Sequence, residues 1–314
     1  MFDPSADAVV LPYWLDRPAD EALAIAREAE RLGYRELWIG EMATFDAFAL
    51  GAAIARDTAR IALTLGPLAL GVRSPVALAL GAGSVSELGG RPARLALGAS
   101  SPTIVAGWHS RPYARLPALA RETLSALRPL LRGERNERGF KLRVAAPAPE
   151  LTLAAFGPKM LGVGAREADR VVLNLVTPAA VRGVRDALEG AAHAAGRPCP
   201  RLAVWVAAAH EPSAEGIAQL ARQVCVYLAA PGYGEMFRAA GFGALVDRAR
   251  AGEPQRALAQ AVPRALLDAV ALLGDASSLR ARASDYVEAG ADEIAIVPVT
   301  AGDAAGRRVL EALR

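Results

Sequence analysis

The chain of 314 residues is long enough for one large α/β domain or two smaller ones. An apolar share of 53% supports a sizeable core, and the low aromatic content of 5% suits helices packed around a buried sheet. The net charge is only +3, without a basic run or an aromatic-interleaved basic patch, which argues against a nucleic-acid-binding protein.

Strand-like and helix-like segments alternate along the chain. The predicted strands are the apolar runs at residues 8–14, 36–41, 60–70, 93–98, 151–156, 170–175, 202–209 and 292–297. The predicted helices are the segments at residues 20–32, 47–57, 76–88, 117–131, 158–166 and 178–195. Residues 212–290 are expected to be mostly helical, with Gly and Pro interruptions, and a short helix is expected after the last strand.

The predicted strands are apolar on both faces and each is followed by a helix, which indicates a parallel sheet covered on all sides. Eight such units predict an α/β fold of the (β/α)₈ TIM-barrel class, with the active site at the carboxyl ends of the strands. We expect residues 1–314 to form a single domain, with about 212–290 as a helical insertion before the last strand. A doubly wound open sheet is the competing prediction, weakened by the lack of a Gly-x-Gly-x-x-Gly motif after the first strand.

The sequence LTLAAFGPKM at residues 151–160 carries the clearest local signal. An apolar strand breaks at Gly157, and a helix begins at Pro158, whose missing N–H would have been unpaired there anyway. The free amides of the first helical turn favour a phosphate, and Lys159 adds a positive charge beside them. A plain strand-to-helix turn is the alternative.

Two other strand ends carry candidate residues. Glu41 follows the second strand; we expect it either to have a partner or a function, or to be a solvated residue at a helix start. Gly66-Pro67 must end or bulge the third strand, because proline cannot donate a ladder hydrogen bond. Its peptide bond is either cis or part of an ordinary trans turn.

The fourth strand ends in Gly98, Ala99 and Ser100, which leave room for a flat ligand and offer a hydroxyl to its edge. Further along the same connection, His109 is predicted either to take part in catalysis or to pack with Trp108 as a lid.

Asn174 ends the sixth strand and is a candidate hydrogen-bond partner for a ring or a phosphate. Of the other histidines, His193 is expected at the surface, and His210 lies at the end of the seventh strand. His210 is predicted either to line the mouth of the barrel or to have a structural role.

Several segments, by their order and spacing, resemble the luciferase-like monooxygenase superfamily, and most closely its branch that uses the deazaflavin coenzyme F420. They are ELWIGEMATFDAF, DTARIALTLGP with Pro75 eight residues beyond Pro67, RPARLALGASS, RETLSALRPLLRGE, AAFGPKML and EADRVVLN. The resemblance covers most of residues 8–200, and residues after about 210 match poorly.

The resemblance implies that a flavin or deazaflavin binds at the C-terminal mouth of the barrel. A cis peptide bulge of the third strand, here at Gly66-Pro67, would support the ring system. Glu41 would lie near the ring edge, and the turn at residues 155–159 would hold the phosphate of the coenzyme tail. A homodimer is implied as well. The position that is His in some deazaflavin enzymes is Met42 here, so no protonating histidine is carried over to it.

The predicted function is an F420-dependent oxidoreductase, in which a hydride passes between C5 of the deazaflavin and a small organic substrate. Glu41 or His109 would serve as proton donor or orienter. The residues expected to bind the cofactor are Glu41, Gly66, Pro67, Leu68, Gly98, Ala99, Ser100, Ala155, Phe156, Gly157, Pro158, Lys159, Met160 and Asn174. The first alternative is an FMN-dependent monooxygenase, because the two cofactors share a tricyclic ring and a ribityl phosphate. The second is a non-catalytic flavin- or deazaflavin-binding protein.

The remaining sequence signals concern the compartment. Cys199 and Cys225 are few and unpatterned, which predicts a reducing environment with neither a metal site nor a disulfide framework. No basic region followed by an apolar core opens the chain, and no apolar run reaches about 18 residues. We therefore expect a cytoplasmic protein without a signal peptide or a membrane span.

Overall fold

The computed structural model describes residues 7–314. Its strands are β1 (Ala8–Val10), β2 (Glu36–Ile39), β3 (Ala62–Ala69), β4 (Arg94–Gly98), β5 (Leu151–Ala154), β6 (Arg170–Asn174), β7 (Arg201–His210), β8 (Ala271–Gly274) and β9 (Glu293–Pro298). The strand order is β6-β5-β4-β3-β2-β1-β9-β7-β8, with a further pairing of β6 with β7. The eight predicted strands correspond to β1–β7 and β9, and this closed parallel order confirms the predicted (β/α)₈ barrel class.

Helices follow nearly every strand, as the alternating pattern predicts. In the first half of the chain they are α1 (Glu21–Arg31), α2 (Ala47–Asp57), α3 (Pro75–Gly89), the π-helical turn η1 (Thr103–Trp108), α4 (Leu116–Leu131) and α5 (Pro158–Glu167). Those that follow are α6 (Pro178–Ala194), α7 (Ala214–Tyr227), α8 (Tyr233–Phe237), η2 (Arg238–Phe242), α9 (Gly243–Arg250), α10 (Gln255–Ala261), α11 (Arg264–Val270), α12 (Ala276–Glu288), η3 (Ala304–Gly306) and α13 (Arg307–Ala312).

The described chain divides into two compact units. The first, Ala29–Val172 with Asp186–Leu202, holds β2–β5 and most of β6, and is called the β2–β6 unit below. The second, which takes the described residues up to Glu28 together with Leu173–Arg185 and Ala203–Arg314, is called the β7–β9 unit. The expectation that residues 1–314 form a single domain stays a prediction.

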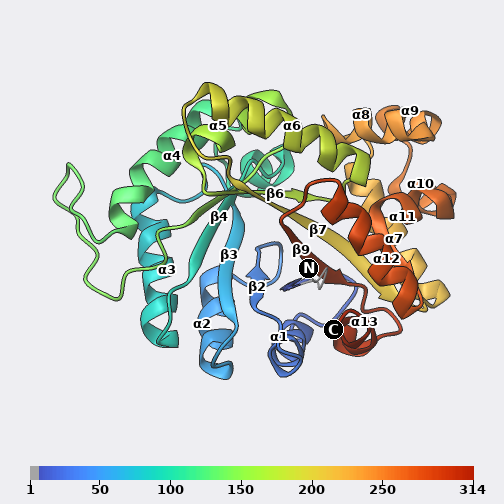
Figure 1. Cartoon of the computed structure of the whole chain (residues 1–314), viewed down its shortest axis with the longest axis horizontal. Coiled ribbons are helices and arrows are strands. Elements are labelled where there is room, and N and C mark those ends of the chain that lie inside the picture. The colour runs from blue at the N-terminus through green and yellow to red at the C-terminus, as the bar shows by residue number, and fades with distance from the viewer. Residues whose placement is uncertain (1–6) are drawn as a thin grey trace. The chain divides into compact units, whose positions relative to one another are not determined.

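Local signals account for the helices of the β2–β6 unit. The Asp46 carboxylate caps α2 by accepting the N–H groups of Phe48 and Ala49. Ser74 caps α3, and Pro75 occupies its first turn. The helices lie side by side along the outside of the strands, and each packs on the next in the order α2, α3, α4, α5 (Figure 1). The strands between them are nearly continuously buried, as parallel strands covered on both faces should be.

The β7–β9 unit contains the one strand that the sequence pattern misses. β8 pairs in parallel with the end of β7, Ala207 against Ala271 through His210 against Gly274, while Ala203–Ala208 of β7 pair with β9. Residues 212–290 are mostly helical, as expected, but the expectation did not include β8. Four apolar residues that directly continue the pattern of α11 cannot be told from a helical turn by periodicity.

Strand boundaries differ from the prediction by up to four residues. β1 ends at Val10 rather than Trp14, because Pro12 has no N–H for a ladder hydrogen bond. β2 ends at Ile39, so Glu41 lies in the loop that follows. The connection after β4, expected to be a loop, contains η1.

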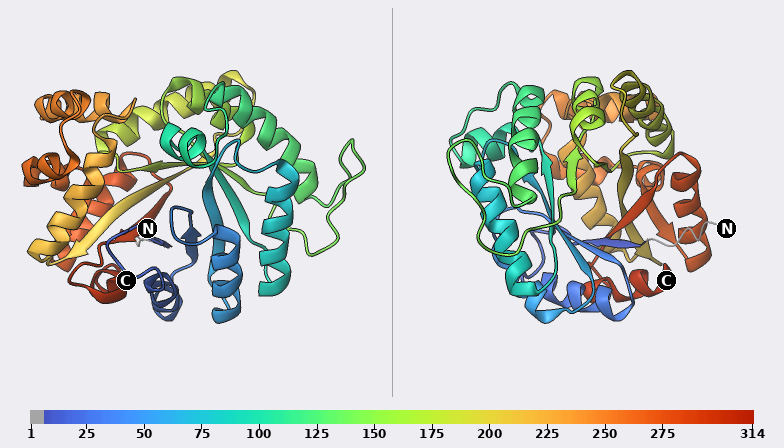
Figure 2. Two further views of the ribbon diagram at one scale, coloured as in Figure 1. Left: turned by 180° about the vertical axis from the view of Figure 1, so that it is seen from behind. Right: turned by 60° about the vertical axis from the view of Figure 1, so that its left-hand side comes forward.

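The long connection between α4 and β5, residues 132–150, extends away from the helices in Figure 1 and in the left view of Figure 2. Its tip is organised locally, since the Asn136 side chain accepts the N–H groups of Arg138 and Phe140. Across residues 7–314, no helix has both the length and the apolar character needed to cross a bilayer.

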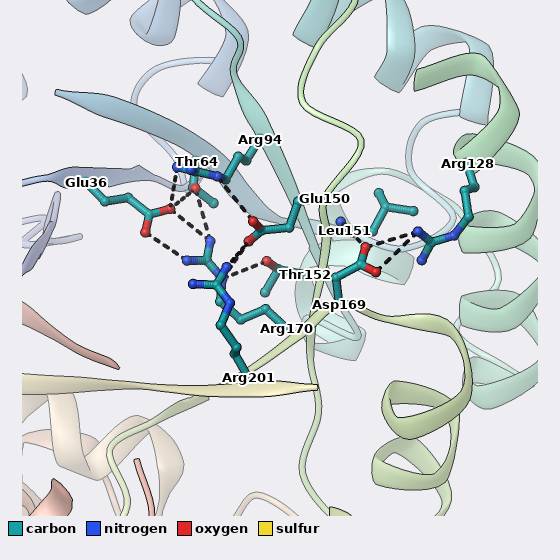
Figure 3. Close-up of polar contacts among 10 residues, drawn as sticks. All are labelled: Glu36, Thr64, Arg94, Arg128, Glu150, Leu151, Thr152, Asp169, Arg170 and Arg201. Atoms are coloured by element: carbon teal, nitrogen blue, oxygen red, sulfur yellow. Dashed lines mark hydrogen bonds and ion pairs between the residues drawn. The ribbon is translucent and has the colours of Figure 1, made fainter. Parts of the chain in front are cut away.

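A buried ionic network joins the amino ends of the strands in the β2–β6 unit (Figure 3). Arg170, the first residue of β6, is 1% exposed, and its guanidinium donates to both carboxylate oxygens of Glu36, the first residue of β2, at 2.8 and 2.9 Å. Thr64 and Thr152 accept further bonds from Arg170, whose guanidinium also lies 4.3 Å from the ring centroid of Trp38.

Outer charges continue the network. Arg94 lies 3.6 Å from Glu36 and 3.5 Å from Glu150, and Arg201 lies 2.7 Å from Glu150. Burial alone would raise the pKa of Glu36, but the hydrogen bonds and charge of Arg170 hold it below its ordinary value. This end of the strands is thus a structural ion cluster, remote in register from the carboxyl ends.

Candidate functional site

The carboxyl ends of β2 to β5 lie at one edge of the sheet in the β2–β6 unit. Ile39 is in register with Leu65, Ala69 with Gly98, and Gly98 with Ala154. Because the strands are parallel and in this register, the segments that follow them start next to one another. All the predicted site residues except Asn174 belong to this unit.

Gly66-Pro67 is a cis peptide bond, which decides between the cis and trans alternatives that the sequence leaves open. The register between β3 and β4 shifts between Leu65 and Leu68, so the strand bulges at this bond, as the family resemblance implies. Gly66 has φ +124, and a Cβ placed on it would lie 2.1 Å from the Ala96 carbonyl oxygen. Leu68 is 1% exposed and so supports the bulge from within the core.

Small residues converge beside the bulge. A Cβ on Gly98 would lie 3.1 Å from the Ala154 Cβ and 3.2 Å from the Pro67 Cβ, so these three positions are in contact. Pro67 and Ala154 are half-buried. Because Gly98 has no side chain, nothing projects from this position between Pro67 and Ala154. The surface formed by β3, β4 and β5 here suits a flat group lying across it.

The turn from β5 into α5 has the geometry expected of an anion-binding helix start. Gly157 is the N-cap residue with φ +84, and no atom lies within 4 Å of a Cβ placed on it. Whereas side chains cap α2 and α3, no side chain caps α5, and Pro158 and the exposed Lys159 follow. Ala155 and Met160 are buried on either side, and Phe156 is half-buried.

Glu41 has a partner that the sequence analysis missed. The Arg73 guanidinium donates from Nη1 to Glu41 Oε2 and from Nη2 to Glu41 Oε1, each at 2.6 Å. Nη2 also donates to Asp46 Oδ2 at 2.6 Å, and the guanidinium lies 5.3 Å from the ring centroid of Phe48. The sequence offered one signal for this partner, an arginine at position 73 in the loop after the third strand.

These contacts shift the pKa values of Arg73 and Asp46. Hydrogen bonding to Glu41 raises the pKa of Arg73, against the opposing effect of burial. Burial alone would raise the pKa of Asp46, but the Ala49 N–H and the Arg73 guanidinium hold it below its ordinary value.

The segment after β4 carries His109 at the molecular surface. Ser100 has φ 58, and its carbonyl oxygen accepts a 3.1 Å bond from the Tyr113 hydroxyl, whose pKa is raised by burial. Trp108 is 53% exposed, and His109, which ends η1, is exposed as well. The structure therefore brings neither side chain into the packed part of the unit, and their predicted roles stay predictions.

Asn174 and His210 belong to the β7–β9 unit. The Asn174 side-chain N–H donates to the Tyr227 hydroxyl at 3.1 Å, and the rings of Tyr227 and Tyr233 are 4.8 Å apart. His210 is the last residue of β7, as predicted. Within the described range 7–314, no three His, Cys, Asp or Glu side chains are grouped so as to hold a metal ion.

Comparison with known proteins adds a family match. A family model described as luciferase-like monooxygenase matches residues 4–293. No curated protein sequence matches the chain.

Solved structures with the same fold cover nearly the whole chain. Coenzyme F420-dependent tetrahydromethanopterin reductase from Methanopyrus kandleri is 16% identical, with a TM-score of 0.80 over 98% of this chain and 97% of that one. An F420-dependent secondary alcohol dehydrogenase is 16% identical, with a TM-score of 0.70 over 98% and 99%. The oxygenating constituent of 3,6-diketocamphane monooxygenase from Pseudomonas putida, in complex with FMN, is 19% identical, with a TM-score of 0.69 over 98% and 96%. At these identities the likeness establishes the fold alone.

Proposed function

Since the chain belongs to the luciferase-like monooxygenase family, we propose that it is an oxidoreductase that uses coenzyme F420 to transfer a hydride to or from a small organic substrate. The observation that carries the proposal is the uncapped start of α5 beside the Gly66-Pro67 bulge. A phosphate and a flat ring need these two features next to each other. Two of the solved structures with this fold are F420-dependent enzymes.

The residues present fit such a cofactor. Amides at the start of α5 have no capping side chain, and Gly157 leaves open space beside them, so a phosphate would find both hydrogen-bond donors and room. Gly98 has no side chain to project between Pro67 and Ala154, which leaves a flat surface for a ring. When bound, a deazaflavin supplies the hydride chemistry through C5 of its ring.

The chain's own groups would bind and orient. Gly66, Pro67 and Leu68 would support one face of the ring, while Gly98, Ala99 and Ser100 would contact its edge. Residues 155–160 would hold the phosphate, and Asn174 is a further proposed ligand. Glu41 or His109 would serve as proton donor or orienter near the reacting atoms. The implied homodimer is part of the same proposal.

The two lysines of the chain provide a matched pair of variants. We expect Lys159→Gln to weaken binding of F420 about tenfold, because it removes one charge-assisted contact to the phosphate, of order 1.4 kcal/mol. Lys141→Gln, in the exposed connection between α4 and β5, should leave the affinity unchanged. Fluorescence titration measures both, and equal affinities of the two variants would argue against a phosphate at α5.

An FMN-dependent monooxygenase is the second candidate, favoured by the FMN-bound structure that shares this fold. Parallel titrations with F420 and FMN, followed by single-turnover assays of reduced cofactor with and without oxygen, distinguish the two. Tight binding of F420 and oxygen-independent turnover support the proposal. Binding of FMN alone, with oxygen consumption, would replace it by the second candidate, and binding without turnover of any substrate would indicate a cofactor-binding protein.

A further inference from the structure

The cluster of Glu41, Arg73 and Asp46 contains one cation and two carboxylates. Nη2 of Arg73 bonds to Glu41 and to Asp46 at 2.6 Å each, so the two carboxylates lie no farther apart than two hydrogen bonds. The side chains of Arg73 and Glu41 are 19% and 22% exposed, so solvent screens this pair only in part. Arg73 is thus the counter-ion of both acids.

The two-point contact sets the form in which Glu41 exists. Both of its oxygens accept from Arg73, one from each terminal nitrogen, which is the fork geometry in which a guanidinium binds a carboxylate. The contact therefore favours the carboxylate over the carboxylic acid. It also fixes the plane of the carboxylate, since the guanidinium is itself held by Asp46 and lies over the Phe48 ring.

We propose that Arg73 is a positioning residue that holds Glu41 as an oriented carboxylate, which makes Glu41 a hydrogen-bond acceptor and a fixed negative charge rather than the proton donor. This inference rests on the proposed function in that it assigns the role of Glu41 toward the bound ring. It leaves proton donation to another group. Within the described residues, Glu41 is linked by these contacts to the charged side chains of Arg73, from the loop after β3, and, through Arg73, of Asp46 at the start of α2.

If Arg73 is the counter-ion of both acids, removing it should make cofactor binding depend on pH. A purely structural role of Arg73 predicts no such pH dependence. In Arg73→Gln two carboxylates lie near one another without a counter-ion, so one of them takes up a proton at a higher pH than an isolated carboxyl does. The affinity of Arg73→Gln for F420, divided by that of the wild type at the same pH, should therefore fall about severalfold as the pH is lowered from about 8 to 5. Adding Asp46→Asn removes the like charge but keeps a good helix cap, so the double variant should recover pH-independent binding.

The experiment titrates F420 and FMN against wild type, Arg73→Gln, Arg73→Gln/Asp46→Asn and Arg73→Lys, with Arg56→Gln on the exposed side of α2 as the control expected to match wild type. Circular dichroism checks folding. Arg73→Lys keeps the charge but not the two-point contact, so it should bind more weakly than wild type without acquiring pH dependence. A wild-type pH profile in Arg73→Gln, a pH dependence that Asp46→Asn does not remove, or wild-type affinity in Arg73→Lys would each overturn the inference.

Cofactor-free unfolding separates this inference from the proposed function. If the wild type binds neither cofactor, the proposed function fails. If Arg73 is the counter-ion of both acids, we still expect the melting temperature of Arg73→Gln to fall, relative to Arg73→Gln/Asp46→Asn, as the pH rises from about 5 to 8. The reason is that a carboxyl whose pKa is raised in the folded state opposes folding once the higher pH ionises it. Parallel pH profiles of the two variants would overturn the Arg73 inference.

Discussion

Replacing Arg170 with Met is expected to lower the free energy of unfolding by about 3–5 kcal/mol at neutral pH. Arg170 is 1% exposed and contacts both oxygens of Glu36, which is itself buried. The substitution fills part of the volume but leaves a buried carboxylate, with Arg94 3.6 Å away. Urea unfolding followed by circular dichroism measures the loss.

The loss depends on pH in a direction that the network dictates. In the wild type the pKa of Glu36 is held below its ordinary value, so its contribution to stability is present above the unfolded pKa of about 4.3 and is lost as the pH falls through the folded value. Without Arg170 the buried carboxyl resists ionisation. The difference between wild type and variant should therefore be largest near pH 7 and shrink below about pH 4.

Two controls test this explanation of the Arg170 effect. Arg201→Met removes an arginine that is 48% exposed and pairs with Glu150, so it should cost at most about 1 kcal/mol. Arg170→Met/Glu36→Gln should regain part of the loss, because no charge is then left buried. A pH-independent loss in Arg170→Met would mean that packing, rather than the charge, is responsible.

Gly66→Ala should have an effect of similar size, at about 2–5 kcal/mol. The new Cβ would lie 2.1 Å from the Ala96 carbonyl oxygen and 2.6 Å from the Leu68 nitrogen, so the backbone of β3 or β4 must move. The left-handed φ of +124 adds strain for any residue with a Cβ. Thermal and urea unfolding of the cofactor-free protein measures the change.

Gly139→Ala is the matched control for this substitution. Gly139 also has a left-handed φ, of +83, but no atom lies within 4 Å of a Cβ placed on it. The control should therefore cost only the conformational term, about 1–2 kcal/mol. If both variants lose the same amount, crowding at the bulge is not what requires glycine at position 66.

The sequence by itself determined the elements and their class. Apolar runs covered by helices predict parallel strands, and Ser74-Pro75 and Gly157-Pro158 mark where α3 and α5 begin. These signals are local, because caps, proline and glycine act within one turn of the residue that carries them. They also placed candidate residues near the carboxyl ends of β2, β4 and β5 and at the bulge inside β3, since Gly, Pro and polar residues mark these points in the chain.

Only the tertiary structure decided which side chains meet. Glu41 and Arg73 are 32 residues apart, and Glu36 and Arg170 are 134 apart, so no spacing rule links them. The sequence left the Gly66-Pro67 bond open between cis and trans, which differ little in free energy in an isolated chain, and the structure has the cis form. β8 is a strand because the end of β7 offers it hydrogen bonds, whereas its four residues alone would equally continue a helix.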